Sequence, residues 1–355
     1  MKKSNAKKKR ILVAPLNWGL GHATRCIPII NALISNGFEP LIASDGVSLK
    51  LLQKEFPKLS SFKLPSYNIT YPKQSKSIKL KLIKDAPYLL KTIKQERKAI
   101  DHLVNSEDIA GIISDNRFGI RHKNVPSVFI THQLQVLSGN TTWLSSKLHQ
   151  NIIKKFDECW VPDYKEQPNL SGCLGHLKNQ PSHVKHIGPL SRFKKLRLPI
   201  KHDLLIILSG LEPQRTYLEE KLLLELQCYN GKACLIKGLI ETEQRITKNE
   251  NVLIYNFMTS AALENALNES RMVLSRSGYT SIMDYAKLEK KVFFIPTPGQ
   301  NEQEYLADKF KKEVIAPTCR QNEFKIAMLN TIEPYTGFKD LHNNDVNYKE
   351  LFSLF

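Results

Sequence analysis

The first third of the chain contains two residues suited to acid/base chemistry, a histidine in a glycine-containing loop and an aspartate at the end of an apolar run. The loop, Asn17-Trp-Gly-Leu-Gly-His22, follows an apolar run, and Gly19 and Gly21 would let backbone N–H groups approach an anion. A histidine directly after such a turn is well placed to move a proton near neutral pH. Asp115 ends another apolar run, so we expect it either to orient His22 or to be the base itself. A turn or cap aspartate is the alternative.

The first loop is only half of a dinucleotide fingerprint. The third glycine of G-x-G-x-x-G would fall on Thr24, which does not specify tight packing around a pyrophosphate. Asp45, at the end of the second apolar run, keeps a dinucleotide interpretation open as a minority alternative.

A second glycine loop, Leu208-Ser-Gly-Leu-Glu-Pro-Gln-Arg215, begins the other half of the chain. It places Gly210 in the turn and Arg215 near the first turn of a helix, where helix end and guanidinium together could neutralise a diphosphate. The sequence contains no Asp-x-Asp pair, which magnesium-dependent sugar-nucleotide sites commonly need. We therefore expect no metal. A solvated Arg215 is the alternative.

The most specific pattern is Ser275-Arg-Ser-Gly-Tyr-Thr-Ser-Ile-Met-Asp284. A strand ends in a small turn, a helix begins, and an acid follows one and a half turns later. That acid could accept hydrogen bonds from ribose hydroxyls, and Gln303 and Glu304, after the next strand, could hold sugar hydroxyls.

Elements that would position these residues alternate between strands and helices. Apolar runs at Arg10–Pro15, Glu39–Ser44, 111–114, 125–130 and 159–162 predict one parallel sheet, and the pattern restarts at 204–208, 232–236, 252–255, 271–275 and 291–295. We predict an α/β chain with two Rossmann-like domains facing a cleft. The expected segments are a basic tail (1–10), an acceptor-binding domain (11–192), a linker (193–202), a nucleotide-sugar domain (203–335) and a closing helix (336–355).

Charge and composition narrow the class of protein to which this chain could belong. The 355 residues are 41% hydrophobic with a formal charge of +18, and the six cysteines form no C-x-x-C pair. No apolar run is long enough for a membrane span and no signal peptide is recognisable, which predicts a cytoplasmic protein. Residues 1–10 carry six positive charges, and residues 71–100 carry nine positive against two negative. Such clusters suit an anionic surface, although residues 1–10 could equally be a solubilising tail.

The stretch from Tyr255 to Ala307 resembles the donor-binding region of family 28 glycosyltransferases, the MurG-like group that includes diacylglycerol galactosyltransferases. The resemblance is thinner before the linker. It places Arg276, Ser277 and Gly278 in the donor turn and Asp284 on the ribose, where MurG has Glu. Family glutamines on the donor sugar fall on Gln303 and Glu304, the second of them changed. Further candidate residues are Phe257 and Met258 at uracil and Asn17, Gly19 and Gly21 at the acceptor.

The resemblance implies a GT-B fold and a metal-independent, inverting hexosyl or N-acetylhexosaminyl transfer from a UDP-sugar co-substrate, with no cofactor. Asp115-Asn-Arg-Phe118 replaces the second glycine loop of the family, so the donor is better supported than a lipid-diphosphate acceptor. Three alternatives remain. They are a UDP-sugar 2-epimerase of the same fold, an NAD-dependent oxidoreductase and a nucleic-acid-binding protein, although no nucleic-acid partner is expected.

A basic, partly apolar stretch from Lys79 to Lys98 could rest on an anionic membrane and present a lipid acceptor. The protein would then be peripheral on the inner face of the cell membrane. The alternative is a solvated pair of helices that covers the first sheet. The sequence does not specify the oligomeric state.

Overall fold

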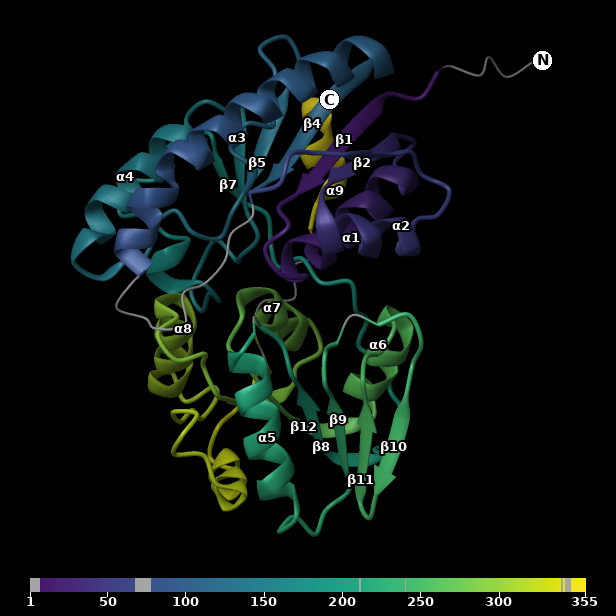
Figure 1. The fold of residues 1–355 in the computed structure, drawn as a ribbon, viewed down its shortest axis with the longest axis vertical. Helices are drawn as coiled ribbons and strands as arrows, with labels where there is room; N and C mark the ends of the chain where they lie inside the picture. The colour runs from purple at the N-terminus through teal and green to yellow at the C-terminus, as the bar shows by residue number, and fades with distance from the viewer. Residues whose placement is uncertain (1–6, 68–77, 211, 240, 340, 342–345) are drawn as a thin grey trace. The chain divides into compact units, whose positions relative to one another are not determined.

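The computed structural model describes residues 7–67, 78–210, 212–239, 241–339, 341 and 346–355. The side chains of residues 78–86 and 140 are outside this description. The chain divides into two compact units (Figure 1). Unit 1 is Met1–Gln167, Cys173–Leu190 and Asn344–Phe355, and unit 2 is Pro168–Gly172 and Ser191–Asn343.

Unit 1 is built on a parallel sheet with the strand order β3-β2-β1-β4-β5-β6-β7. Its strands are short apolar runs, of which the central ones are fully buried, as expected where helices cover both faces. The strands are β1 (Arg10–Pro15), β2 (Glu39–Ser44), β3 (Ser61–Lys63), β4 (Ile109–Asp115), β5 (Ser127–Ile130), β6 (Glu158–Val161) and β7 (Val184–His186). The helices are α1 (Gly21–Ser35), α2 (Gly46–Glu55), α3 (Ile78–Glu107) and α4 (Thr142–Ile153), with 3-10 turns η2 (Gly139–Thr141) and η3 (Gly172–Leu174).

The two faces of this sheet have different covers. Strand register puts Leu12, Ile112, Phe129 and Cys159 on one face, where they form clusters with residues of α3 and α4. The opposite face bears Trp160, against which the C-terminal segment packs.

That segment consists of α9 (Tyr348–Leu351) and η5 (Phe352–Leu354). Phe352 contacts the rings of Phe38 and Trp160, with centroids 5.7 and 6.4 Å apart. Phe355 lies so close to Gly111 that a Cβ there would overlap its ring, and its carbonyl oxygen accepts a hydrogen bond from Lys9. The helix of the predicted closing segment (336–355) is thus confined to Tyr348–Leu351, and residues before 344 belong to unit 2.

Unit 2 has a sheet with the order β10-β11-β9-β8-β12-β13, parallel except for β10, which pairs antiparallel with β11. Every residue of β10 is exposed, so it has no apolar pattern by which to predict it. The strands are β8 (His202–Ile207), β9 (Ala233–Ile236), β10 (Ile246–Asn249), β11 (Val252–Tyr255), β12 (Ser270–Ser275) and β13 (Lys291–Phe294). The helices are α5 (Gln214–Leu226), α6 (Ser260–Asn268), α7 (Tyr279–Lys287) and α8 (Asn301–Lys312), with a 3-10 helix η4 (Ile326–Ile332).

Both sheets have a topological switch point. In unit 1 the chain builds outward from β1 through β2 to β3 and then continues from β4 on the other side of β1; unit 2 does the same about β8 and β12. In open α/β sheets, ligands bind beyond the carboxyl ends of the strands at this point. The expected two Rossmann-like parallel sheets are confirmed, and their strand order fixes where to look for a site.

Candidate active site

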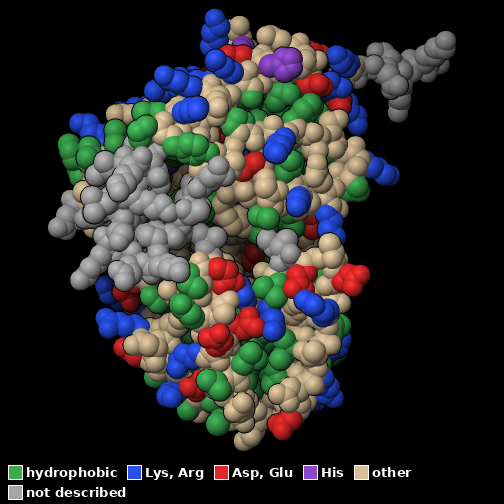
Figure 2. Space-filling view, in the orientation of Figure 1, with side chains coloured by type: hydrophobic (Ala, Val, Ile, Leu, Met, Phe, Trp, Pro, Cys, Tyr) green, Lys and Arg blue, Asp and Glu red, His purple; other side chains and the backbone are tan. Residues whose placement is uncertain are grey.

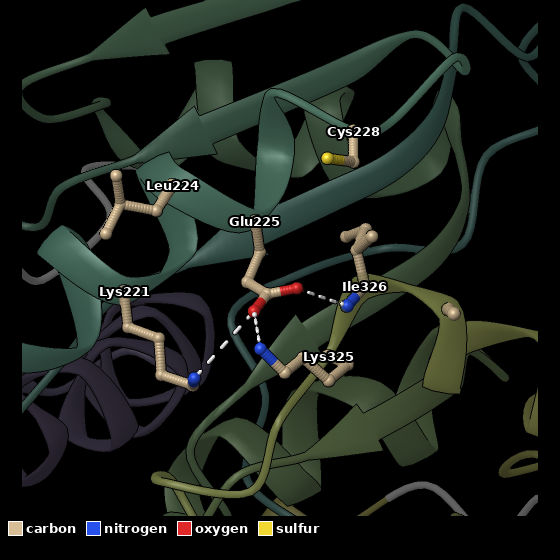
Figure 3. A pocket seen from close by; sticks show the side chains of 7 residues that line it. Lys221, Leu224, Glu225, Cys228, Lys325 and Ile326 are labelled. Carbon is tan, nitrogen blue, oxygen red and sulfur yellow. Dashed lines mark hydrogen bonds and ion pairs between the residues drawn. The ribbon is translucent and has the colours of Figure 1, made fainter.

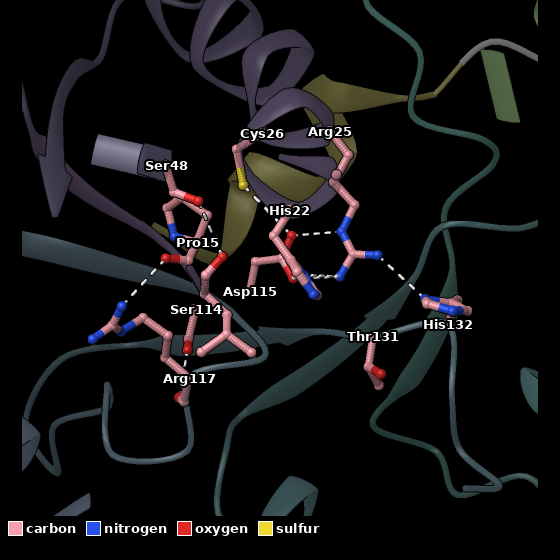
Figure 4. Close-up of polar contacts among 12 residues, drawn as sticks. Pro15, His22, Arg25, Cys26, Ser48, Ser114, Asp115, Arg117, Thr131 and His132 are labelled. Atoms are coloured by element: carbon pink, nitrogen blue, oxygen red, sulfur yellow. Dashed lines mark hydrogen bonds and ion pairs between the residues drawn. The ribbon is translucent and has the colours of Figure 1, made fainter. Parts of the chain in front are cut away.

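His22 and Asp115 meet at the switch point of unit 1. Asp115 is the last residue of β4, His22 is the second residue of the helix after β1, and these two strands are neighbours. Nδ1 of His22 lies 2.8 Å from Oδ1 of Asp115 (Figure 4). The two residues that the sequence predicted for acid/base chemistry therefore form one pair.

Arg25 completes this pair. It lies one turn after His22 on α1, and its guanidinium donates two hydrogen bonds to Asp115, one of them from Nε to Oδ2 at 2.5 Å. Nη2 of Arg25 lies 2.9 Å from Nδ1 of His22, and Nη1 lies 3.2 Å from Nδ1 of His132 (Figure 4). The side chain of Asp115 is fully buried, whereas that of His22 is 13% exposed.

These surroundings separate the roles of the two residues. Burial, with a contribution from Arg25, lowers the pKa of His22 even though Asp115 raises it, so the imidazole is neutral at pH 7. Burial alone would raise the pKa of Asp115, but Arg25 and His22 hold it well below its usual range. A buried carboxylate that stays ionised because two partners hold it by hydrogen bonds is a poor proton acceptor near neutral pH. The geometry favours His22 as the base and Asp115 as the group that orients it.

The first loop is fastened by a second buried network. Asn17 Nδ2 donates to Asp45 Oδ2 at 3.1 Å, and Asp45 Oδ1 accepts from Arg117 Nη1 at 2.6 Å. Arg117 also donates to Glu96 at 2.7 Å. Asp45 thus holds the loop of Asn17 and Gly19 in place, and its ion pair removes the support that the sequence gave to a dinucleotide ribose contact.

The switch point of unit 2 brings together Gly210, after β8, and the turn Arg276-Ser277-Gly278, after β12. Gly210 has a φ of +104°, which a residue with a side chain rarely adopts. Gly278 is the N-cap of α7 with no side chain to cap the helix, and a Cβ there would meet nothing within 4 Å. Open space therefore lies at the beginning of α7.

Arg276 and Ser277 do not face this space. The guanidinium of Arg276 donates to the carbonyl oxygens of Ile295 and Pro296, both at 3.1 Å, and of Gln214 at 2.9 Å. Burial lowers its pKa to about 10. Ser277 Oγ donates to the carbonyl of Gln303 at 2.7 Å. Both side chains thus hold the surrounding loops together, and their place in a donor-binding turn stays a prediction.

Arg215 is likewise engaged by the protein. Its guanidinium donates to Glu212 Oε1 and Glu219 Oε2, each at 2.6 Å, and Lys237 pairs with Glu219 at 2.8 Å. Burial would lower the pKa of Arg215, but the two carboxylates raise it. Two cations face two anions, so these four side chains together carry no net charge. The predicted contact of Arg215 with a diphosphate stays a prediction.

Asp284 lies in the second turn of α7, where the sequence placed it. Its Oδ1 accepts a hydrogen bond from Ser191 Oγ at 2.6 Å, and Ser191 Oγ in turn accepts from the backbone N–H of Phe193 at 3.1 Å. Burial raises the pKa of Asp284 to about 6, against the opposing effects of Arg192 and Ser191. The carboxylate is therefore ionised at neutral pH and close to protonation.

The remaining predicted donor residues lie on a loop and in the first turn of a helix at the same edge of the sheet. Phe257 and Met258 are half-buried between β11 and α6, and Gln303 and Glu304 are in the first turn of α8. Gln303 Oε1 accepts from Thr297 N and Glu304 Oε1 from Gly299 N, both at 2.9 Å. The pair shapes the loop before α8.

Arg25 and Asn256 are among the buried residues of these sites that the sequence analysis missed. Arg25 could have been found from its spacing, because a residue three positions after His22 shares its helix face. Asn256 orders the loop of Phe257: its Oδ1 accepts from Arg245 N at 2.7 Å and from Phe257 N at 3.0 Å. Nothing in its neighbourhood in the sequence marks Asn256 as buried.

Unit 2 has a cavity at each of two places. One of about 540 Å³ lies by the C-terminal half of α5, where Glu225 contacts Lys221, Lys325 and the N–H of Ile326 (Figure 3), and it contains no predicted site residue. The other, of about 900 Å³, includes Glu304 and Pro296.

Within the described part of the chain, no three His, Cys, Asp or Glu residues lie close enough to hold a metal ion. In the same residues, no helix is long and apolar enough to cross a membrane.

Comparison with known proteins agrees with this architecture. Residues 218–333 match the family model described as the glycosyltransferase family 28 C-terminal domain. The structure is similar to MurG of Acinetobacter baumannii, with 12% identity, 98% of this chain and 99% of that chain covered, and a TM-score of 0.57. No curated sequence is similar enough to match.

Two further similar structures were solved with nucleotides. One is the spinosyn rhamnosyltransferase SpnG complexed with thymidine diphosphate, with 12% identity, 97% and 95% coverage and a TM-score of 0.62. The other is Arabidopsis thaliana UGT89C1 complexed with UDP-L-rhamnose, with 12% identity, 98% coverage of both chains and a TM-score of 0.59. The chain therefore has the GT-B glycosyltransferase fold, and its residues 218–333 match the C-terminal domain of glycosyltransferase family 28.

Proposed function

We propose that this protein transfers a hexosyl or N-acetylhexosaminyl group from a UDP-sugar to an acceptor hydroxyl, with inversion and without a metal ion. The observation that carries the proposal is the family 28 match over residues 218–333, because this segment contains the turn at Gly278 and Asp284 at the switch point of the second sheet. Unit 2 would bind the donor, and unit 1 would supply the base.

His22 is the proposed base. With its Nδ1–H donated to Asp115, Nε2 carries the lone pair and can accept the acceptor's hydroxyl proton. The acceptor oxygen then forms a bond to the anomeric carbon from the face opposite the diphosphate. The bond from that carbon to the diphosphate oxygen breaks, and UDP leaves with the electron pair. The proton on His22 passes to solvent.

We further propose that helix N-termini stabilise the charge on the leaving diphosphate. Because Arg215 is neutralised by Glu212 and Glu219, the positive end of α7, open at Gly278, is the better candidate. Asp284 would accept hydrogen bonds from ribose hydroxyls. No cofactor takes part in this scheme.

The acceptor is proposed to be a lipid at the inner face of the cell membrane. The helix predicted to contact that surface is part of α3, a single helix rather than the pair considered from the sequence. The side chains of Leu80, Leu82 and Ile83 lie outside the described residues, whereas Tyr88 and Leu90 are 43% and 61% exposed.

Calorimetry with UDP tests the donor class, with TDP, NAD and a short DNA duplex as competitors. Asp284→Ala should weaken UDP binding by tenfold or more, about 1.4 kcal/mol. Asp308→Ala, which removes an exposed acid of α8, is the control. Absence of UDP binding would refute the donor assignment. Turnover of a UDP-sugar without any acceptor would instead support the 2-epimerase alternative.

A further inference from the structure

Helix α4 of unit 1 exposes large apolar side chains. Its inner side is anchored by Ile153 in the core and by His149, whose ring contacts Phe118 and Phe129 with centroids 5.7 and 5.8 Å apart. On the outer side, the exposed fractions are 72% for Trp143, 50% for Leu144 and 57% for Leu148. Burial of large apolar side chains stabilises a contact, so three of them exposed together on one short helix indicate a binding surface.

The charged residues of α4 and of its C-terminal end are of one sign. Lys147 lies between the apolar residues, with its Nζ 5.0 Å from the centre of the Trp143 ring, and Lys154 and Lys155 follow at the end of the helix. Residues 142–155 include no Asp or Glu. An aromatic ring, leucines and lysines on one face are the composition of helices that lie in the interface of an anionic bilayer.

Helix α3 extends the basic character. Strand register places α3 and α4 over the same face of the sheet, and Figure 1 shows them on one flank of unit 1. Lys91, Lys94 and Lys98 are exposed on α3, whereas Glu96 points inward to Arg117. On the face of the molecule in Figure 2, Lys and Arg side chains lie along this flank.

We propose that Trp143, Leu144, Lys147 and Leu148 form a membrane-docking surface that inserts its apolar side chains into the interface of an anionic bilayer. A second copy of this chain is a poorer occupant. A two-fold contact through this helix would bring the lysines of one copy against those of the other. The proposal rests on the proposed function in its lipid acceptor, which this surface would reach, but it does not depend on donor binding.

Vesicle co-sedimentation tests the proposal. The full chain should bind vesicles of phosphatidylcholine with 30% phosphatidylglycerol, and 0.5 M salt should weaken the binding. Trp143→Ser/Leu144→Ser/Leu148→Ser should reduce partitioning at least tenfold. The control, Tyr217→Ser/Leu224→Ser/Ile246→Ser, removes three exposed apolar side chains of unit 2 and should bind like the parent. Lys147→Glu/Lys154→Glu/Lys155→Glu should abolish the preference for the anionic lipid.

Fluorescence gives a second readout. Trp160 is fully buried, so in a Trp18→Phe background the emission of Trp143 should shift to the blue on vesicle binding and be quenched by brominated lipid. Equal binding by the parent and the α4 variant, or an unshifted emission, would overturn the proposal. So would a parent dimer that the α4 variant dissociates, since the surface would then be a self-contact. A failure of UDP calorimetry would leave these outcomes unchanged.

Discussion

His22 and Asp115 come from elements 93 positions apart in sequence, yet Nδ1 of one lies 2.8 Å from Oδ1 of the other. The strand order explains the contact, because β1 and β4 are neighbours and both point to the same edge. The two side chains differ in exposure: that of His22 is partly accessible to solvent, whereas that of Asp115 is fully buried.

Replacing the proposed base should remove chemistry without removing binding. His22→Gln should lower kcat by about 10²- to 10⁴-fold, the usual contribution of a general base, with UDP affinity unchanged by calorimetry. Because burial lowers the pKa of His22, kcat/KM of the parent should stay level down to below pH 6.5 and fall only under that value. His102→Gln, an exposed histidine of α3, is the matched control. Full activity of His22→Gln would exclude it as the base.

Asp115→Asn should affect stability as well as activity. The amide leaves the charge of Arg25 buried without its carboxylate, and breaking a buried pair costs about 3–5 kcal/mol. Thermal unfolding should show a clearly lowered Tm. Asp101→Asn, whose carboxylate is 63% exposed, should unfold like the parent. An unchanged Tm for Asp115→Asn would show that the pair is not a structural anchor.

Ser191→Ala should change the pH dependence of UDP binding. The ionised form of Asp284 accepts hydrogen bonds from ribose hydroxyls more strongly than the protonated form, so affinity should fall as the pH drops through about 6. The Ser191 hydroxyl lowers the pKa of Asp284, and its removal should move the midpoint to higher pH. Ser191→Thr should restore the parent profile, and Thr331→Ala serves as a control. A midpoint that does not move would refute the positioning role of Ser191.

Arg215→Met should lower the Tm and leave UDP affinity as in the parent, because the guanidinium serves Glu212 and Glu219 rather than an anion. The double variant Arg215→Met/Glu219→Met should be no more stable than Arg215→Met, because Lys237 pairs with Glu219 and would lose this partner in the double variant. A large loss of UDP affinity in Arg215→Met would return this residue to the donor site.

Gly111→Ala tests the docking of the C-terminal segment. The added methyl group would overlap the ring of Phe355, and overpacking of this kind typically costs about 1–3 kcal/mol. The combination of Gly111→Ala with Phe355→Ala should be less destabilised than the sum of the two single variants. Additive changes in unfolding free energy would show that the ring of Phe355 does not pack against residue 111.

The sequence was most informative where apolar runs end in glycine. The strands at Arg10–Pro15 and Val252–Tyr255 have the predicted bounds, and the meeting of His22 and Asp115 follows from parallel strands ending at one edge. The partners of the arginine side chains were not predicted, because the three-dimensional fold, and not the neighbouring sequence, decides which groups a guanidinium contacts. Trp143 was missed as well, because a tryptophan in a helical pattern predicts burial and not a surface.

Lys9 and Phe355 are in contact although 346 positions separate them, and all of unit 2 lies between. Unit 2 is in this sense an insertion within unit 1, whose second sheet face is completed by the last residues of the chain. We therefore expect the usual order of domain folding during synthesis, from the N-terminus onward, to be reversed. Unit 2 can reach its native core while unit 1 still awaits its final helix, so the half that contains the proposed base should be the last to mature.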